Sequence, residues 1–277
     1  MKIVFLLGTD GADVRSIKTC RSLVRLGHEV HFVGWNRRHE PPICRAEGVN
    51  LHLMQLPVPH GRSTLGGQLK FARYAARQLR AIRPDVVCAI NEDNVLRSAP
   101  FKGIFFKRLV CDFYDSHADR FSNARLPVRW LVGAASGFCK TISDRLTVTD
   151  TYRWARLGKY RSKAAIVQNV PEDPGAALSQ NYPQGPTKLF VTGAMSTRRG
   201  LPQILQAVEQ TPDATIVAAG MPSDEFAENF VKHQRVDYRG VVTPGESLEL
   251  ASHCDAVFAF YEPSCENHLF ASPNKLF

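Results

Sequence analysis

The sequence predicts an α/β protein with two domains, each built around a parallel sheet. Short β-branched runs alternate with longer helical patterns along most of the 277 residues. Strands separated by helices are typical of parallel sheets with crossover connections. The alternation stops once, at 171–187, where PEDPG and NYPQGP interrupt it and indicate a linker. We therefore expect one domain over 1–170 and a second over 188–277.

Each predicted element follows from its local pattern. In the first domain we expect strands at 2–8, 28–35, 49–56, 85–91, 108–117, 145–150 and 164–170, and helices at 14–26 and 66–83. In the second we expect strands at 188–193, 214–220, 236–240 and 255–261, and helices at 201–210, 224–233 and 246–253. The opening run MKIVFLL is too short for a signal peptide and is interpreted as a buried strand.

Composition excludes several classes of protein. Hydrophobic residues make up 44% and charged residues 22%, as in an ordinary globular protein. No apolar run approaches the ~20 residues that a membrane-spanning helix needs. The seven cysteines form no CxxC pair, so we expect free thiols in a reducing cytosol and neither a metal site nor a disulfide framework.

Charge is divided unevenly between the two halves. Residues 1–170 hold 28 Lys/Arg and 13 Asp/Glu, a net charge of +15, whereas residues 171–277 hold 7 and 13, a net charge of −6. This asymmetry indicates an anionic partner for the first half: nucleic acid, an anionic membrane or a phosphorylated substrate. Nucleic acid is the weakest of these, because no recognisable nucleic-acid motif is present.

Two stretches of the first half concentrate basic residues. Helix 66–83 places four of them on one face, opposite Leu69, Ala72, Ala76 and Leu79, and a solvated face explains that pattern. Residues 120–145 add five more around Trp130 and Phe138, a combination that suits a membrane interface.

Three strand-to-helix connections hold residues with candidate chemistry. The first turn contains Gly8, Asp10 and Gly11, where glycines let the backbone approach a phosphate, although the turn does not match GxGxxG. His117 lies at the end of the strand predicted at 108–117, at the edge where parallel sheets bind ligands. In the second half, Gly193 to Gly200 includes Arg198 and Arg199, which together with a helix N-terminus would suit a diphosphate.

Taken together, these motifs resemble the family 4 glycosyltransferases, over nearly the whole chain. The matching segments are DVR and GHEV near the start, Tyr114 to His117 as the family's YDxH, QNVP before the linker, the segment from Gly193 to Gly200, and YEP followed by PNKLF at the end. The resemblance implies the GT-B architecture: two Rossmann-like domains that face each other across a cleft, the second one incomplete. It also implies sugar transfer, of the hexosyltransferase class, with retention of anomeric configuration.

The same resemblance implies roles for individual residues. His117 would contact the transferred sugar as the catalytic residue, and Gly8, Asp10, Gly11 and Arg15 would lie on the acceptor side. The donor side would comprise Gly193, Arg198, Arg199, Glu262, Asn267, Asn274 and Lys275. Cationic side chains would stabilise the departing diphosphate without a metal or other cofactor.

Two departures from the family pattern qualify this resemblance. Ala194 replaces the arginine that often follows the glycine at 193, which leaves more of the diphosphate charge to Arg198 and Arg199. The chain ends one residue before the glutamate of PNKLFE. We therefore expect a fragment of a longer protein, with weak or no turnover of its own.

The expected partners are a nucleotide sugar, an anionic lipid-linked or glycan acceptor, and an anionic membrane surface, with no nucleic acid. The expected location is the cytoplasm, peripheral at the inner membrane face. Two alternatives remain open: a nucleotide-sugar-modifying enzyme such as an epimerase, and a catalytically silent α/β binding module. Vesicle binding would separate the transferase from the epimerase, and nucleotide-sugar binding would separate both from the silent module.

Overall fold

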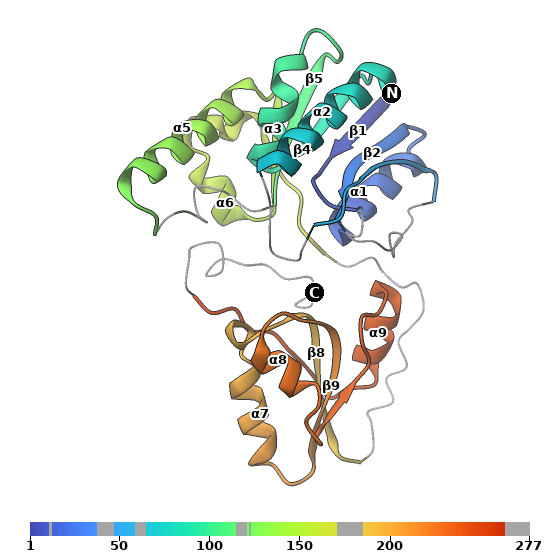
Figure 1. Ribbon diagram of the computed structural model, residues 1–277, viewed down its shortest axis with the longest axis vertical. Coiled ribbons are helices and arrows are strands. Elements are labelled where there is room, and N and C mark those ends of the chain that lie inside the picture. Colours follow the sequence, from blue (N-terminus) through green and yellow to red (C-terminus); the bar gives the residue numbers. More distant parts are fainter. Residues whose placement is uncertain are drawn as a thin grey trace. The chain divides into compact units, whose positions relative to one another are not determined.

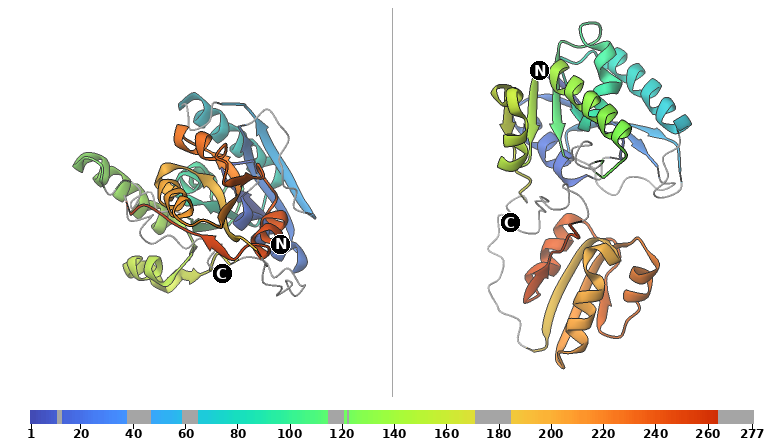
Figure 2. Two further views of the ribbon diagram at one scale, coloured as in Figure 1. Left: turned by 90° about the horizontal axis from the view of Figure 1, so that it is seen from below. Right: turned by 90° about the vertical axis from the view of Figure 1, so that its left-hand side faces the viewer.

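The computed structural model describes residues 1–10, 13–37, 47–58, 65–114, 121, 123–170 and 185–263. The chain divides near residue 170 into two compact units. We call the described residues up to 169 unit 1 and those from 170 onward unit 2, and each is described by itself. Both units are layered α/β structures (Figures 1 and 2).

Unit 1 is built on a seven-stranded parallel sheet with the strand order β3-β2-β1-β4-β5-β6-β7. Its strands are β1 (Lys2–Leu6), β2 (Glu29–Asn36), β3 (Val49–Gln55), β4 (Val86–Ile90), β5 (Arg108–Phe113), β6 (Arg145–Val148) and β7 (Ala164–Ile166). Its helices are α1 (Val14–Arg25), α2 (Leu65–Ile82), α3 (Asn91–Ser98), α5 (Leu126–Ile142) and α6 (Thr151–Arg156), with short 3₁₀ helices η1 (Ala99–Phe101) and η2 (Gly158–Lys163).

Both faces of this sheet are covered, because alternate strand residues are apolar on both sides. Val4 and Leu6 of β1 pack with residues of α2, α3 and α5 on one face. Ile3 and Phe5 of the same strand pack with Cys20 of α1 on the other. Helices on both faces of a parallel sheet are the arrangement that the continuous apolar runs predict.

The buried face of α2 differs from the expectation. Its core residues are Phe71, Ala75, Leu79 and Ile82, whereas Leu69 is exposed. Apolar residues occupy two neighbouring stripes of this helix, and packing against the sheet selects the stripe that contains the aromatic residue. The basic residues on its exposed face agree with the solvated interpretation.

Unit 2 holds a four-stranded parallel sheet among its described residues, with the order β10-β9-β8-β11. Its strands are β8 (Thr187–Met195), β9 (Ala214–Pro222), β10 (Val236–Tyr238) and β11 (Ala256–Phe258); its helices are η3 (Thr197–Arg199), α7 (Leu201–Glu209), α8 (Glu225–Phe230) and α9 (Pro244–Ser252). Residues of α7 and α8 pack on one face of the sheet, and residues of α9 pack on the other. The predicted fold class is confirmed: both units are Rossmann-like.

Several elements differ from their predicted bounds. The strand expected at 108–117 ends at Phe113, and helices α3, α5 and α6 were not predicted. In α5 the apolar residues extend over more than half of the helix circumference, which leaves only a narrow polar stripe and weakens the pattern on which helix prediction relies.

Candidate functional site

Ligands of open parallel sheets bind beyond the carboxyl ends of the strands. Each unit presents one such edge. In unit 1 it is formed by the residues that follow β1, β2, β4, β5 and β6. In unit 2 it is formed by the residues that follow β8, β9 and β11.

The first turn of unit 1 is attached to the neighbouring strand. The Trp35 amide donates to the Thr9 carbonyl at 2.9 Å, and a Cβ atom at Gly34 would lie only 2.3 Å from that same oxygen. Gly34 is therefore required by close backbone approach. A Cβ atom at Gly8 would make only ordinary contacts, the nearest being Arg37 Nη2 at 3.6 Å. Gly8 and Asp10 lie in this turn, and Gly11 lies outside the described residues.

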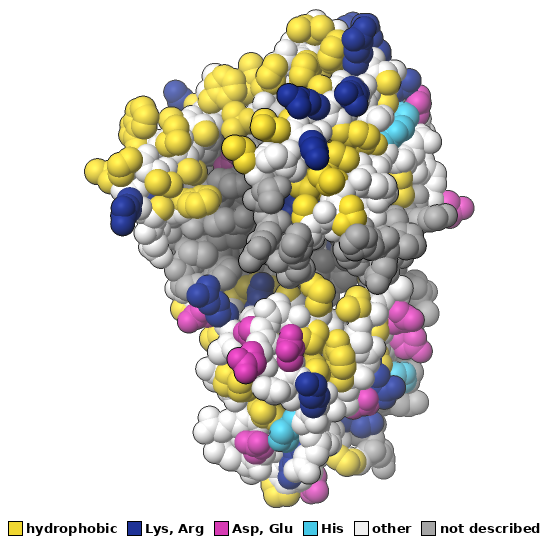
Figure 3. Space-filling view, viewed as in Figure 1, with side chains coloured by type: hydrophobic (Ala, Val, Ile, Leu, Met, Phe, Trp, Pro, Cys, Tyr) yellow, Lys and Arg dark blue, Asp and Glu magenta, His cyan; other side chains and the backbone are white. Residues whose placement is uncertain are grey.

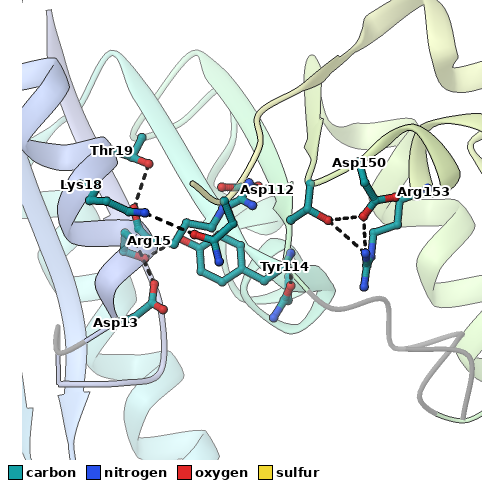
Figure 4. Close-up of polar contacts among 12 residues, drawn as sticks. Asp13, Arg15, Lys18, Thr19, Asp112, Tyr114, Asp150 and Arg153 are labelled. Atoms are coloured by element: carbon teal, nitrogen blue, oxygen red, sulfur yellow. Dashed lines mark hydrogen bonds and ion pairs between the residues drawn. The ribbon is translucent and has the colours of Figure 1, made fainter. Parts of the chain in front are cut away.

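Arg15 lies in the interior of unit 1, next to the end of β5. Its Nη2 donates to Asp112 Oδ1 at 2.9 Å, and both side chains are less than a tenth exposed (Figure 4). The guanidinium also stacks 4.6 Å from the centre of the Tyr114 ring, whose hydroxyl bonds to Ser16 Oγ at 2.7 Å. Burial raises the pKa of Asp112, and the Arg15 charge opposes that rise. Arg15 thus connects α1 to the strand that leads to residues 115–117.

The backbone at the end of β5 is fixed from a second side. The Tyr114 amide donates to Asn91 Oδ1 at 2.9 Å, and Asn91 itself has φ = 62°. This left-handed conformation is uncommon for a residue other than glycine, and strained residues concentrate at functional sites. His117 follows three residues after Tyr114 and lies outside the described residues. No sequence pattern indicated this role of Asn91.

A further buried arginine lies at the end of the adjacent strand β6. Arg153 of α6 pairs with Asp150, and Asp150 also caps that helix by accepting from the Arg153 amide at 2.8 Å (Figure 4). Arg153 is 9% exposed. Arg15 and Arg153 are therefore placed alike: in each case an aspartate near the end of a strand neutralises a buried guanidinium.

Two other arginines near this edge stack on aromatic rings. Arg37, just after β2, lies 4.3 Å from the Trp35 ring centre, and Arg97 of α3 lies 5.5 Å from that of Phe71. The two rings are themselves stacked at 5.9 Å. Burial, and then the nearby charge of Arg97, lowers the pKa of Arg37. Arg97 also pairs with Asp93. Sequence reasoning missed this cluster, although an arginine directly after a buried strand was a usable signal.

In unit 2, the edge begins with a pair of glycines on neighbouring strands. Gly193 has φ = 98° and is paired in register with Gly220, which has φ = 144°. A Cβ atom at Gly220 would lie 1.9 Å from the Gly193 carbonyl oxygen, whereas one at Gly193 would meet nothing within 4 Å. Gly193 is thus required by its conformation, and it leaves open backbone at the end of β8.

The structure brings Arg198, Arg199 and Glu262 together at this edge. The Arg199 guanidinium lies 3.8 Å from the centre of the Tyr261 ring. The Glu262 amide donates to the Arg198 carbonyl at 3.2 Å, and the two side chains form an ion pair at 3.7 Å. Arg198 is 74% exposed and Glu262 48%, so this pair is weak and accessible.

Asp224 holds the arginine loop in place. Its carboxylate accepts from the Thr197 amide at 2.8 Å and from the Ala227 amide at 2.9 Å, which caps α8. Although burial alone would raise the pKa of Asp224, these hydrogen bonds lower it. Asn267, Asn274 and Lys275, the other predicted donor residues, lie outside the described residues.

Three further features bear on function in the described part of the chain: metal ligands, membrane-spanning helices and cysteines. No group of three or more His, Cys, Asp or Glu side chains there could hold a metal ion. No helix in that part is long and apolar enough to cross a membrane. The described cysteines are free thiols, and burial raises the pKa of Cys20 and of Cys139 to about 12.

Two Rossmann-like units in one chain, each with polar and glycine residues at the carboxyl edge of its sheet, define a GT-B protein. Residues 10–138 match the family of glycosyl transferase 4-like domains. The chain therefore contains a glycosyl transferase 4-like domain, and the resemblance to family 4 glycosyltransferases is confirmed. No curated protein matches the chain by sequence.

Solved structures share the fold across both units. Sucrose-phosphate synthase from Thermosynechococcus elongatus is 15% identical, with a TM-score of 0.67 over 95% of this chain and 76% of that one. HepE of Anabaena, solved with UDP and glucose, is 15% identical, with a TM-score of 0.63 over 93% and 73%. UDP-GlcNAc 2-epimerase from Neisseria meningitidis, bound to UDP-GlcNAc, is 11% identical, with a TM-score of 0.62 over 93% and 77%. At these identities the likeness is one of fold.

Proposed function

We propose that this chain belongs to a retaining glycosyltransferase of the hexosyltransferase class. It would move a sugar from a nucleoside-diphosphate sugar to a glycan or lipid-linked acceptor in polysaccharide or glycolipid biosynthesis. The observation that carries the proposal is the arginine pair at the carboxyl edge of the unit 2 sheet, formed by the exposed Arg198 and the half-buried Arg199. The family match and the nucleotide complexes of structurally similar proteins support it.

The donor diphosphate would bind at the loop between β8 and α7. Stacking on Tyr261 orients the planar Arg199 guanidinium, whose N–H groups can bond two phosphate oxygens at once. Arg198 would add a second charge after exchanging Glu262 for the ligand. The open backbone at Gly193 allows close approach. By the resemblance, Asn267, Asn274 and Lys275 would complete the pocket.

The same cations would act in the chemical step. The bond between the sugar's anomeric carbon and the diphosphate oxygen breaks, a bond to the acceptor hydroxyl oxygen forms, and the proton of that hydroxyl passes to an oxygen of the leaving diphosphate. Negative charge develops on the leaving diphosphate, and preorganised guanidinium groups stabilise it. We propose that this stabilisation requires no metal ion or other cofactor. Transfer rates that are unchanged by a chelator would support that point.

Unit 1 would bind the acceptor. Gly8, Asp10, Gly11 and Arg15 belong to or follow the first turn, and Arg15 would act by positioning β5, because it is buried against Asp112. His117 would contact the transferred sugar. The cluster of Arg37 and Arg97 supplies positive charge next to Gly8, which suits a phosphorylated acceptor. The +15 charge of residues 1–170 suits a peripheral position at the inner membrane face, with the protein in the cytoplasm.

A transfer assay tests the proposal. The chain is incubated with UDP- and GDP-sugars, with and without lipid-diphosphate and oligosaccharide acceptors, and the products are analysed by mass spectrometry and NMR. The expected result is slow nucleotide release that depends on the acceptor, in keeping with the weak turnover expected of this chain, and a product that keeps the donor's anomeric configuration. Loss of product in His117→Ala, with donor binding preserved, would support the role of His117. An inverted product would contradict the retaining mechanism.

One alternative has its own support. Structural similarity to UDP-GlcNAc 2-epimerases, at 11% and 14% identity, is compatible with an enzyme that modifies the nucleotide sugar itself. Such an enzyme needs no acceptor. The same assay separates the two, because an epimerase changes the sugar of the donor in the absence of any acceptor.

A further inference from the structure

Helix α5 exposes apolar side chains that unit 1 leaves uncovered. Leu126 is 75% exposed, Trp130 74%, Leu131 64% and Phe138 50%. Figure 3 shows this helix as a hydrophobic projection at the left of unit 1. Exposed apolar side chains are common singly, but a contiguous group of large ones marks an interaction surface.

These side chains share one face of the helix. Leu126, Trp130 and Phe138 are separated by multiples of four residues, and Leu131 lies beside them. The buried residues of α5, Ser136 and Cys139, lie on the opposite face. The exposed stripe is therefore about 18 Å long. Residues 125–131 are all exposed, so the first turns of α5 project from unit 1 with large apolar side chains in contact with solvent.

The charge around this stripe has one dominant sign. Residues 125–163 contain nine Lys or Arg and two Asp or Glu. Both acidic side chains are already paired, Asp144 with Lys102 and Asp150 with Arg153. The helix itself contains no acidic residue. Among the described side chains of this region the exposed charge is therefore mainly positive, while the Glu92 carboxylate lies against the inner side of α5 and accepts from Ser136 Oγ at 3.0 Å.

The 3₁₀ helix η2 extends this surface past the C-terminal end of α5. Thr141 Oγ1 and the Tyr160 hydroxyl are 3.0 Å apart, and Lys163 Nζ donates to the Thr141 carbonyl at 3.2 Å. Lys159 and Lys163 both lie over the Tyr160 ring. A tyrosine flanked by lysines is the composition of a membrane interface, where the ring sits among headgroups and the cations meet phosphates.

We infer that the exposed face of α5 and η2 docks unit 1 onto an anionic lipid bilayer. The apolar stripe would insert at the boundary between headgroups and acyl chains, and the surrounding cations would bind lipid phosphates. Charge complementarity selects this occupant, because an uncharged apolar partner would leave the cations without counter-ions. The inference rests on the proposed function, because docking would bring unit 1 to a bilayer that contains the lipid-linked acceptor.

Vesicle flotation with the full chain tests the inference, and helix α2 supplies the controls. The vesicles are phosphatidylcholine with or without phosphatidylglycerol, and no nucleotide sugar is present. Leu131→Asp on α5 is compared with Leu69→Asp on α2, since Leu69 is also exposed. Arg125→Ala/Arg129→Ala is compared with Arg73→Ala/Arg77→Ala; all four arginines are exposed.

We expect binding only to the anionic vesicles. Leu131→Asp should abolish it, and each arginine removed near α5 should weaken it about fivefold, while the α2 variants bind like the parent chain. Of the three tryptophans, Trp130 is exposed, Trp35 is buried and Trp154 is half-buried beneath the Arg161 guanidinium. Lipids brominated on the acyl chain should therefore quench the parent chain more strongly than Trp130→Phe.

Three outcomes would overturn the inference: no binding to anionic vesicles, equal losses from the α2 and α5 variants, or self-association in sedimentation that Leu131→Asp removes while vesicle binding is absent. Because vesicle binding requires no donor chemistry, its failure is separable from failure of the transferase proposal. If the chain bound vesicles but no nucleotide, the docking surface would be supported and the transferase proposal would be contradicted.

Discussion

The two units use arginine in opposite ways. In unit 1, whose sequence carries the large positive charge, Arg15 and Arg153 at the strand ends are buried and paired with aspartates. In the acidic second half, Arg198 and Arg199 are displayed at the sheet edge by a tyrosine and a glutamate. Net charge therefore does not locate an anion site. What matters is whether a guanidinium is neutralised inside the fold or presented at its edge.

The largest effect on stability should come from breaking the buried pair of unit 1. Asp112→Ala leaves Arg15 charged and unpaired in the interior, which should destabilise the protein by about 3–5 kcal/mol. Chemical denaturation measures this change. The matched control is Asp237→Ala in unit 2, because Asp237 pairs with Arg239 at the surface and its loss should cost less than about 1 kcal/mol. Equal effects would contradict the contrast between the units.

A smaller effect should follow from crowding the glycine pair of unit 2. In Gly220→Ala the new methyl group would meet the Gly193 carbonyl at 1.9 Å, in a backbone conformation that alanine rarely adopts. We expect a loss of about 3 kcal/mol. Gly245→Ala serves as the control, because its methyl group would enter open space. Equal thermal unfolding midpoints for the two variants would contradict the close approach of β8 and β9 at these glycines.

The smallest effect should come from releasing the arginine loop. Asp224→Ala removes the cap of α8 and the bond to Thr197, which should cost about 1 kcal/mol. Because the folded pKa of Asp224 is lowered, its contribution is present above the unfolded value of about 4 and disappears as the pH falls through the folded pKa. Unfolding curves of parent and variant should thus converge in acid. The control is Asp213→Ala, at an exposed position of the same unit, which should unfold like the parent chain.

The sequence predicted the fold better than the site. Buried parallel strands appear as continuous apolar runs, so both sheets could be predicted from runs such as those ending at Leu6 and Ile90. Helix α5 was not predicted, because its apolar residues extend over more than half of the helix circumference and leave only a narrow polar stripe. The arginines of unit 1 were equally ambiguous, since a guanidinium that folds inward and one that faces a ligand have the same sequence. The burial of Arg15 could be recognised only once the position of its partner Asp112, 97 residues further along the chain, was known.

Calorimetric titration tests the central claim most directly. UDP, GDP and their sugar conjugates are titrated into the chain, into Arg199→Ala and into the surface control Arg239→Ala. We expect one nucleotide to bind the parent and the control alike, and Arg199→Ala to weaken it about ten- to a hundredfold while the free nucleoside binds equally to all three. No binding at millimolar nucleotide would contradict the transferase and favour a silent binding module. Equal affinity in Arg199→Ala would remove the arginine loop from the donor site.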